Sequence, residues 1–344
     1  MNIEAATSAV ARLWAEQDPG ARGVTLEPCP VSGNNRVFVA RRSDGGKVVA
    51  KFYYAGQAGE TDRLRAEWDF LAHAYPACPR SLPCPLAQAG QQRLALYEFI
   101  DGVKFGPDQV GAAHVDAAAG LIAAINAAPV AGELPPAREA CFSLAEHFAV
   151  IDRRLDRLNT IALEDAAAVV LAGEMRHYWA ERRAAIEAGA SALGICFDQP
   201  IPQDQRVLSP SDFGFHNALL RPDGEVVFID FEYAGWDDVA KLASDFFFQP
   251  AVPVDRSHYQ RFVAPIVRSM ANGAAVRRRI DLLRPIFGLK WCCIMLNHFL
   301  PDMAVKARFA DPDHDEVRRK SEQLSKARKA FQQLVIDSWP ISIS

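Results

Sequence analysis

The spacing of hydrophobic and polar residues predicts a strand-rich N-terminal region. Two short runs rich in valine and aromatic residues flank the Ser-Asp-Gly-Gly stretch at 43–46, so a β-hairpin is expected there. Residues 3–16 carry valine and leucine at helical spacing, and a second helix is expected at about 60–74. A further apolar run at 93–100 predicts one more strand.

Later in the chain the pattern changes to that of alanine- and leucine-rich helices, with long helix-forming segments at 163–190 and 312–338. We therefore predict an α+β protein with a small lobe, made of an antiparallel sheet and a helix, and a large, mainly helical lobe. The expected domains are 1–98 for the small lobe, 99–102 for a hinge and 103–344 for the large lobe. A crevice between two lobes is a usual place for a ligand.

Composition and charge exclude several classes of function. The 344 residues are 50% hydrophobic and 23% charged, as in a globular protein with ample core. The formal net charge of −4 gives no basic surface for nucleic acid or an anionic membrane. The apolar stretch at 291–300 is too short to span a bilayer, and residues 1–6 are not expected to begin a signal peptide. Seven cysteines without a C-x-x-C pair favour a reduced, cytoplasmic protein.

One short region carries the residue types that phosphoryl transfer from Mg-ATP requires. Asp212 and Asn217 bound the stretch Asp-Phe-Gly-Phe-His-Asn, and Asp230 follows after a hairpin. The first carboxylate can accept the proton of a hydroxyl, while the amide and the second carboxylate supply oxygen ligands for magnesium. His216 is expected to hydrogen-bond within this loop. An ordinary surface hairpin with acidic ends is the alternative interpretation.

The hairpin is expected to bring Asn217 and Asp230 together across its strands. The intervening Arg-Pro-Asp-Gly stretch is a strong turn signal. If Leu220 lies opposite Glu225, Asn217 lies opposite Phe228, and the period of two puts Asn217 and Asp230 on one face as diagonal neighbours. Their Cβ atoms would then lie roughly 7–8 Å apart, a gap that a magnesium ion fits. A register shifted by one residue would remove this argument.

Two charged residues of the small lobe stand at positions expected to be buried. Lys51 lies inside an apolar strand, and Glu67 lies on the inward stripe of a helix between Leu64 and Leu71. These side chains should pair, because either charge buried alone would be costly. The lysine would then grip the phosphates of ATP. The alternative is that Lys51 extends its amine to water and Glu67 is half exposed.

A polar loop precedes the first strand of the N-terminal hairpin. Ser32, Gly33 and Asn34 tolerate tight turns and offer backbone N–H groups to an anion. The loop is therefore expected to cover the phosphates of ATP. Because it has a single glycine, a plain connecting loop stays open as the alternative.

In this order, the residues resemble the aminoglycoside phosphotransferase and choline kinase superfamily, which has a bilobal protein-kinase-like fold. The resemblance covers nearly the whole chain, and the stretch at 229–235, Ile-Asp-Phe-Glu-Tyr-Ala-Gly, is similar to the choline and ethanolamine kinase branch. The resemblance implies that Asp212 is the catalytic base or orients the hydroxyl. It also implies that Asn217 and Asp230 bind Mg²⁺.

The resemblance further assigns the contacts with the nucleotide. Lys51 would contact the α- and β-phosphates, and Glu67 would orient it. Backbone groups of Glu98, Phe99 and Ile100 would bind adenine. The implied cofactors are thus ATP and Mg²⁺.

The chain departs from the family pattern in three places. Pro210 and Ser211 stand where the family usually has His-Gly or His-Asn before the catalytic aspartate, so another group must brace the loop. Lys241 stands where the family usually has the acid of a D-L-A stretch, and Asp245, one helical turn on, is the candidate to replace that acid. Glu232 is expected to bind a second magnesium, with a capping role in the loop as the alternative.

We therefore predict an ATP-dependent phosphotransferase that transfers the γ-phosphate to a hydroxyl of a small molecule, with a non-catalytic nucleotide-binding pseudokinase as the alternative. The acceptor (an amino alcohol, a sugar or an aminoglycoside-like compound), the preference for ATP over GTP and the oligomeric state stay open. Candidate wall residues for the acceptor are Glu232, Trp236, Asp237, Trp291 and Asp302. For Asp237 and Trp291 a structural role is the preferred explanation.

Overall fold

The computed structural model describes residues 2–20, 23–29, 35–54, 62–127, 130, 134–301, 303 and 315–336. Contacts between Cα atoms divide the chain into two compact units, each built from three segments. The first unit consists of Met1–Arg138, Leu208–Trp236 and Ser257–Ile266, and the second, here the helical unit, of Glu139–Val207, Asp237–Arg256 and Val267–Ser344. Segments that are far apart in the sequence therefore fold together in each unit.

An antiparallel sheet of five strands forms the N-terminal part of the first unit, in the order β1-β2-β3-β5-β4. Its strands are β1 (Thr25–Pro28), β2 (Arg36–Arg41), β3 (Lys47–Phe52), β4 (Pro85–Ala89) and β5 (Leu94–Glu98). The predicted N-terminal hairpin is confirmed as β2 and β3, and Gly45 in its turn has a φ of 91°, a conformation that favours glycine. The strand predicted at 93–100 is confirmed as β5.

Two helices accompany this sheet, α1 (Ile3–Gln17) and α2 (Arg63–Ala74), as the sequence predicts. Asn2 caps the first and Asp62 the second, each accepting a hydrogen bond from the backbone N–H three residues on. The apolar face of α1 packs against one face of the sheet in a shared core. This core includes Val10, Leu13, Trp14, Phe38, Ala50, Phe52 and Leu96.

The rest of the first unit carries a second, smaller sheet in the order β6-β8-β9. The additional elements are β6 (Val103–Lys104), α3 (Ala112–Ala127), β8 (Ala218–Leu220), β9 (Val226–Phe228) and the start of α7 (Tyr259–Arg268). Two further strands, β7 (Arg206–Ser209) and β10 (Gly235–Asp238), pair with each other. β7 leads into the Asp212 loop, and the β8–β9 hairpin follows it, so this part of the unit places the motif.

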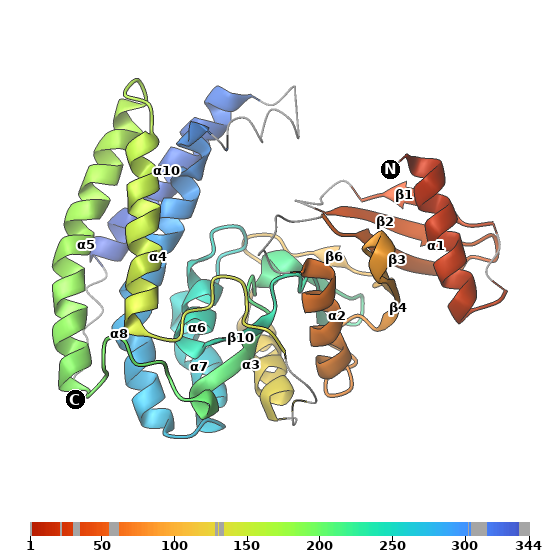
Figure 1. Cartoon of the computed structure of the whole chain (residues 1–344), viewed down its shortest axis with the longest axis horizontal. Helices are drawn as coiled ribbons and strands as arrows, with labels where there is room; N and C mark the ends of the chain where they lie inside the picture. Colours follow the sequence, from red (N-terminus) through yellow and green to blue (C-terminus); the bar gives the residue numbers. More distant parts are fainter. Residues whose placement is uncertain are drawn as a thin grey trace. The chain divides into compact units, whose positions relative to one another are not determined.

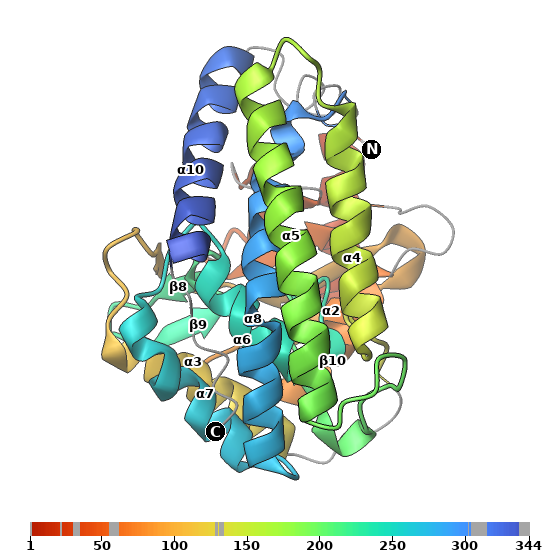
Figure 2. The ribbon, with the colours of Figure 1, turned by 90° about the vertical axis from the view of Figure 1, so that its left-hand side faces the viewer.

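The helical unit is built from long helices that lie side by side. They are α4 (Leu144–Arg157), α5 (Ala166–Ala192), α8 (Gly273–Leu296) and α10 (Glu316–Ile336). A shorter helix, α6 (Val239–Phe248), packs against α8. Both views of the ribbon show α4, α5, α8 and α10 running alongside one another (Figures 1 and 2). The long helices predicted at 163–190 and 312–338 are confirmed as α5 and α10 over the described residues.

Helix α8 makes a close approach to its neighbours at Gly288. A Cβ atom there would lie 2.6 Å from a methyl carbon of Leu334 on α10 and 3.1 Å from the ring of Phe248 on α6. Both distances are shorter than ordinary carbon–carbon contacts. The glycine therefore allows three helices to share one packed interface.

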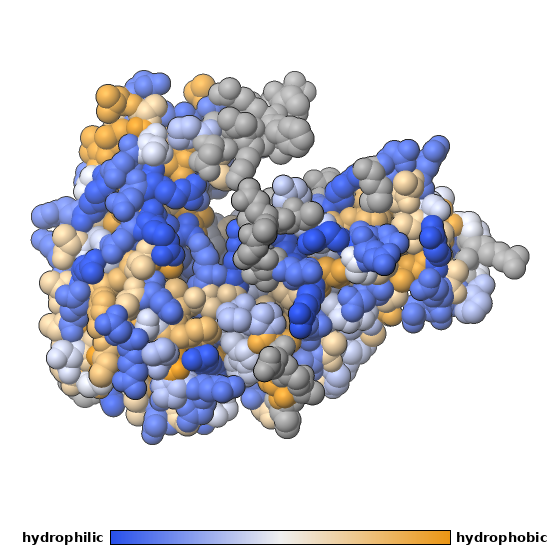
Figure 3. All heavy atoms as spheres, viewed as in Figure 1, coloured by the Kyte–Doolittle hydropathy of each residue, from blue (hydrophilic) through white to orange (hydrophobic). Residues whose placement is uncertain are grey.

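The predicted α+β class is confirmed, because the N-terminal part holds an antiparallel sheet and the C-terminal part is mainly helical. The lobes predicted at 1–98, 99–102 and 103–344 stay a prediction, since the contact units divide the chain by a different criterion. Every helix of the described residues is too short or too polar to cross a membrane. On the face drawn in Figure 3, hydrophilic residues are interspersed with small hydrophobic areas.

Candidate active site

The loop that carries Asp212 is held by its own residues. The side-chain amide of Asn217 donates to the backbone carbonyl of Asp212 at 3.0 Å and lies 3.4 Å from its Oδ2. The imidazole Nε2 of His216 lies 3.1 Å from Oδ1 of Asp212, which confirms the predicted hydrogen bond within the loop. The Asp212 side chain is 43% exposed, so its carboxylate is fixed in position yet open to a substrate.

Buried aromatic residues between the polar groups of the same loop anchor it to the core. Phe213 and Phe215 are both buried, and their ring centroids lie 4.6 Å and 5.8 Å from that of Phe228 on β9. Phe105 contacts the other side of Phe215, at 5.1 Å between ring centroids. Alternation of buried rings with polar side chains thus turns Asp212 and His216 away from the core.

Asp230 lies two residues beyond the end of β9. The backbone N–H of Ile229 donates to the carbonyl of Asn217 at 2.9 Å, so Asp230 directly follows the residue opposite Asn217. Asp230 has a φ of 70°, in the left-handed region that aspartate tolerates better than most residues. The next residue, Phe231, is buried and stacks on Phe70 with 4.8 Å between ring centroids. This anchor leaves the Asp230 side chain 44% exposed.

The strand register predicted for this hairpin is wrong by one residue. Leu220 lies opposite Val226, not Glu225, because Arg221 and Glu225 are themselves paired and close a three-residue loop. Gly224 ends that loop with a φ of 87°, as expected for a turn followed by a left-handed residue. The diagonal argument for Asn217 and Asp230 therefore fails, and the backbone bond places Asn217 opposite Ile229, the residue before Asp230.

Lys51 joins the sheet to this loop. Its ammonium lies 2.6 Å from Glu67 on α2 and also contacts Asp230, so the expected Lys51–Glu67 pair is present. The pKa of the Lys51 ammonium is raised. Burial acts to lower it, but the negative charges of Glu67 and Asp230 outweigh that effect. Burial raises the pKa of the Glu67 carboxyl, although Lys51 opposes that shift. The Tyr53 hydroxyl donates to Glu67 at 2.8 Å and completes a buried network.

The remaining predicted nucleotide contacts are placed only in part. Ser32, Gly33 and Asn34 lie outside the described residues. The backbone N–H of Glu98 donates to the backbone carbonyl of Cys84, and the Ile100 side chain is buried. The roles of Glu98, Phe99 and Ile100 at adenine stay predictions.

Within the part of the chain that the structure describes, the carboxylate of Glu232 contacts Arg63 and Asn35, and its charge helps to raise the pKa of Lys51. It is buried, with Oε1 3.5 Å from the guanidinium of Arg63 and Oε2 accepting from the side-chain amide of Asn35. Its role as a ligand of a second magnesium stays a prediction.

The residues present fit a magnesium–nucleotide complex better than a site built from protein alone. Among the described residues, no three or more His, Cys, Asp or Glu side chains gather as a metal site. Asn217 and Asp230 instead offer an amide oxygen and a half-exposed carboxylate, and a backbone bond joins Asn217 to the residue before Asp230. Magnesium takes few protein oxygens and completes its shell with phosphates and water, which matches this donor set.

Some contacts at the site were missed by reasoning from the sequence. Lys104 on β6 donates to the carbonyl of His216 at 3.0 Å, and burial lowers the pKa of its ammonium despite the opposing charge of Asp230. Nothing in the sequence around Lys104 signals this contact, because it joins residues 112 positions apart. Arg63 and Asn35 were missed for the same reason.

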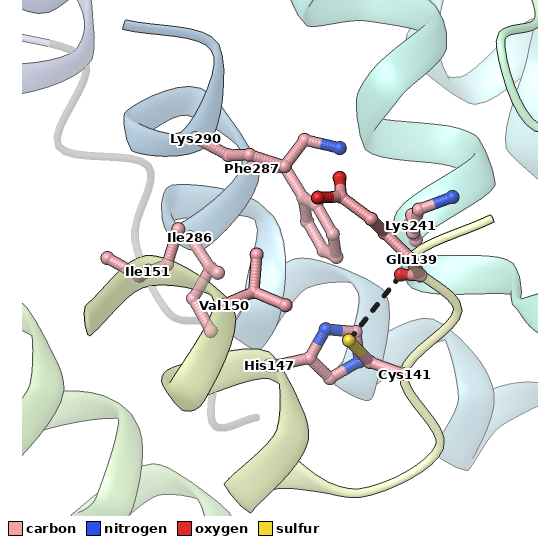
Figure 4. Close-up of a pocket in the computed structure, with 9 residues that line it drawn as sticks. All are labelled: Glu139, Cys141, His147, Val150, Ile151, Lys241, Ile286, Phe287 and Lys290. Atoms are coloured by element: carbon pink, nitrogen blue, oxygen red, sulfur yellow. Dashed lines mark hydrogen bonds between the residues drawn. The ribbon is translucent and has the colours of Figure 1, made fainter. Parts of the chain in front are cut away.

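The helical unit contains a separate buried network of charges around a small cavity (Figure 4). Lys241 pairs with Asp237 at 2.6 Å, while Asp245 pairs with Lys290 at 2.6 Å and accepts from the indole of Trp291 at 2.9 Å. Asp237 and Trp291 thus have structural contacts, as preferred from the sequence.

At the start of α6, Asp238 caps the helix by accepting from Ala240 at 2.8 Å. Asp245 as a replacement for the family acid stays a prediction. Asp302 lies outside the described residues.

The structure thus holds a lysine paired with a helix glutamate and a loop aspartate, and a second aspartate held by an asparagine. The chain belongs to the phosphotransferase enzyme family, whose model matches residues 25–269. The predicted resemblance and the prediction of an enzyme of the small-molecule kinase class are confirmed at the level of this family. No curated protein matches the chain.

Solved structures of small-molecule kinases share the fold. The choline kinase from Cryptosporidium parvum Iowa II has a TM-score of 0.59 at 11% identity, covering 97% of this chain and 99% of that chain. The macrolide 2'-phosphotransferase MphH from Brachybacterium faecium has a TM-score of 0.55 at 16% identity, covering 93% and 98%. The amicoumacin kinase hAmiN, in complex with AMP-PNP, Ca²⁺ and Ami, has a TM-score of 0.53 at 14% identity, covering 99% and 95%. The predicted protein-kinase-like fold is thereby confirmed.

Proposed function

We propose that this protein transfers the γ-phosphate of ATP, bound with Mg²⁺, to a hydroxyl group of a small molecule. The observation that carries the proposal is the ammonium of Lys51, which contacts both Glu67 and Asp230. An ammonium that joins the sheet to a half-exposed carboxylate is suited to hold a triphosphate and its metal ion. The Asp212 carboxylate, held by Asn217, supplies the group for the acceptor hydroxyl.

Each residue then has a defined task. Lys51 binds the phosphates and Glu67 keeps it in place. Asn217 and Asp230 would hold Mg²⁺, which when bound neutralises charge on the phosphates. Asp212 orients the acceptor hydroxyl and accepts its proton. Because the transition state of phosphoryl transfer is loose, orientation and charge neutralisation account for most of the rate.

The remaining sequence-based assignments belong to the same proposal. Ser32, Gly33 and Asn34 would cover the phosphates, and the segment 98–100 would bind adenine. A cytoplasmic location and the absence of nucleic-acid and membrane partners also stay predictions.

The acceptor is proposed only as a class. The solved structures that share the fold are named as kinases of choline, a macrolide and amicoumacin, so the fold accommodates different alcohols. An amino alcohol, a sugar and an aminoglycoside-like compound are therefore equal candidates. Members of each class should be tested side by side.

The test is a screen for ADP release from Mg-ATP against a panel of amino alcohols, sugars, aminoglycosides and macrolides. We expect at least one compound to stimulate ADP release by the wild-type protein, and Asp212→Ala to lower that rate by orders of magnitude. A stimulated rate that is equal in Asp212→Ala would contradict the assigned role of the carboxylate.

A pseudokinase is the second candidate, and Pro210 in place of the usual histidine is the observation that favours it. In that case ATP would bind, but no compound would stimulate ADP release above the level of Asp212→Ala. The same screen therefore separates the two functions, provided that nucleotide binding is measured in parallel.

A further inference from the structure

Glu232 stands two residues beyond the candidate metal ligand Asp230, and its carboxylate contacts Asn35 and Arg63. Its charge also helps to raise the pKa of the Lys51 ammonium. The residue is only 5% exposed, and each of its oxygens has its own partner. Oε2 accepts from the side-chain amide of Asn35, and Oε1 lies 3.5 Å from the guanidinium of Arg63. The partners precede Glu232 by 197 and 169 positions, so the contact joins distant parts of the first unit.

Asn35 connects this carboxylate to the end of the hairpin that carries Lys51. The residue directly precedes β2, is buried, and its Oδ1 accepts from the backbone N–H of Tyr54 at 3.1 Å. Tyr54 follows β3 by two positions and Lys51 by three. One amide thus spans the start of β2, the end of β3 and the carboxylate of Glu232.

Arg63 connects the same carboxylate to the helix that carries Glu67. It is the first residue of α2 and is 7% exposed, and its guanidinium also lies 5.4 Å from the ring centroid of Tyr233. Glu67 stands one helical turn further on, on the same side of the helix as Arg63. A shift of the first turn of α2 would therefore move Glu67 relative to Lys51.

We infer that Glu232, through Asn35 and Arg63, positions the nucleotide-binding residues of the first unit rather than binding a metal ion. The inference rests on the proposed function, because it assigns a positioning residue to the same site. Asn35, Arg63 and Glu232 are here called the Glu232 clasp. Both oxygens of this buried carboxylate are already held by partners, one directly before β2 and one on α2, and loss of the carboxylate would leave the buried guanidinium of Arg63 without its anion, which is costly.

A positioning role for Glu232 predicts a result that a role as metal ligand does not predict. Glu232→Gln and Asn35→Ala should each weaken the binding of ATP in EDTA, without Mg²⁺, by about tenfold, as expected for the loss of a buried hydrogen bond to a charged group. The variant with both changes should bind ATP no more weakly than the weaker-binding single variant, because both changes remove the same contact.

The Mg²⁺ concentration for half-maximal activity of each single variant should stay within about twofold of wild type. Glu225→Gln, which makes the same change at an exposed residue paired with Arg80, is the control.

Opposite results would overturn the inference. If Glu232→Gln leaves Mg²⁺-free ATP binding unchanged and raises the Mg²⁺ requirement, Glu232 is a metal ligand. If the two single effects multiply in the double variant, Asn35 and Glu232 act independently and no clasp exists. If Glu232→Gln fails to fold, Asn35→Ala can be used instead to compare Mg²⁺-free ATP binding with the Mg²⁺ requirement, since this change leaves the Glu232–Arg63 pair intact.

Failure of the proposed function would look different from failure of the clasp. If the wild-type protein binds no nucleotide, the proposed function fails and the clasp is judged by thermal unfolding. The losses in melting temperature should then be non-additive between Asn35→Ala and Glu232→Gln. Additive losses would overturn the clasp.

Discussion

The imidazole Nε2 of His216 lies 3.1 Å from Oδ1 of Asp212. The family usually braces its catalytic aspartate with a histidine two positions earlier, where this chain has Pro210. Here the histidine stands on the other side of the aspartate, in the short helical turn at 215–217, and its carbonyl accepts from Lys104 at 3.0 Å. The loop is therefore braced from its C-terminal side.

His216→Ala should lower kcat by about tenfold and leave the KM for ATP nearly unchanged, because the change removes a hydrogen bond to a charged group that does not touch the nucleotide. His216→Gln should recover part of the loss, since its side-chain amide can reach the same carboxylate. Steady-state kinetics of the three proteins checks this prediction. An unchanged kcat in His216→Ala would contradict the role of His216 in holding the aspartate.

Lys51→Met should destabilise the protein by about 3–5 kcal/mol near neutral pH, because it leaves the buried Glu67 without its cation. Burial already raises the pKa of Glu67, and loss of Lys51 should raise it further. A raised acid pKa in the folded state means that stability falls as pH rises from the unfolded pKa towards the folded one. Urea unfolding of Lys51→Met should therefore show higher stability at pH 5 than at pH 8.

The matched control adds Glu67→Gln to Lys51→Met. This double variant should be more stable than Lys51→Met at pH 8, because no buried charge is left alone. A double variant that is less stable than Lys51→Met would argue that the carboxylate is stabilised by groups other than the lysine.

Asp238 should make the helical unit sensitive to acid. Burial acts to raise the pKa of its carboxyl, but Arg279 at 2.6 Å and His147 at 3.1 Å outweigh burial and lower the pKa from 3.8 to about 2. A lowered acid pKa stabilises the folded state above the unfolded value, and this stability is lost as pH falls from 3.8 towards 2. The loss amounts to about 2 kcal/mol.

Asp238→Asn is the comparison, because asparagine also caps a helix but does not titrate. The variant should be less stable than wild type at pH 6, and its stability should fall by about 2 kcal/mol less between pH 5 and pH 2. Guanidinium unfolding at a series of pH values checks both points. Parallel acid profiles for the two proteins would rule out the assigned coupling.

Gly235→Ala should destabilise the first unit by about 3 kcal/mol, at the upper end for overpacking. A Cβ atom there would lie 2.2 Å from the carbonyl oxygen of Pro135 and 2.6 Å from the backbone nitrogen of Ala137, so the backbone itself must move. Gly173→Ala in α5 is the control, since a Cβ there meets nothing within 4 Å, and it should stabilise by up to about 1 kcal/mol. Thermal unfolding of both variants makes the comparison, and equal melting temperatures would refute the close approach.

The local features of the site were predictable from the sequence, and the distant ones were not. Charges at buried positions predicted the Lys51–Glu67 pair, because burial of either charge alone is costly. The strand register was wrong because a turn signal does not reveal whether three or four residues form the loop, and Gly224 ends a loop of three. The partners of Glu232 stand too far away in the chain for any periodicity to reveal them.

The most direct test of the central claim is calorimetric titration of ATP, with and without Mg²⁺, into wild type, Asp212→Ala and Asp230→Ala. The account predicts that wild type and Asp212→Ala bind ATP more tightly when Mg²⁺ is present. Asp230→Ala should show no such gain, because the carboxylate beside Asn217 and Lys51 is lost. A gain from Mg²⁺ in Asp230→Ala equal to that of wild type, or no ATP binding by wild type, would contradict the account.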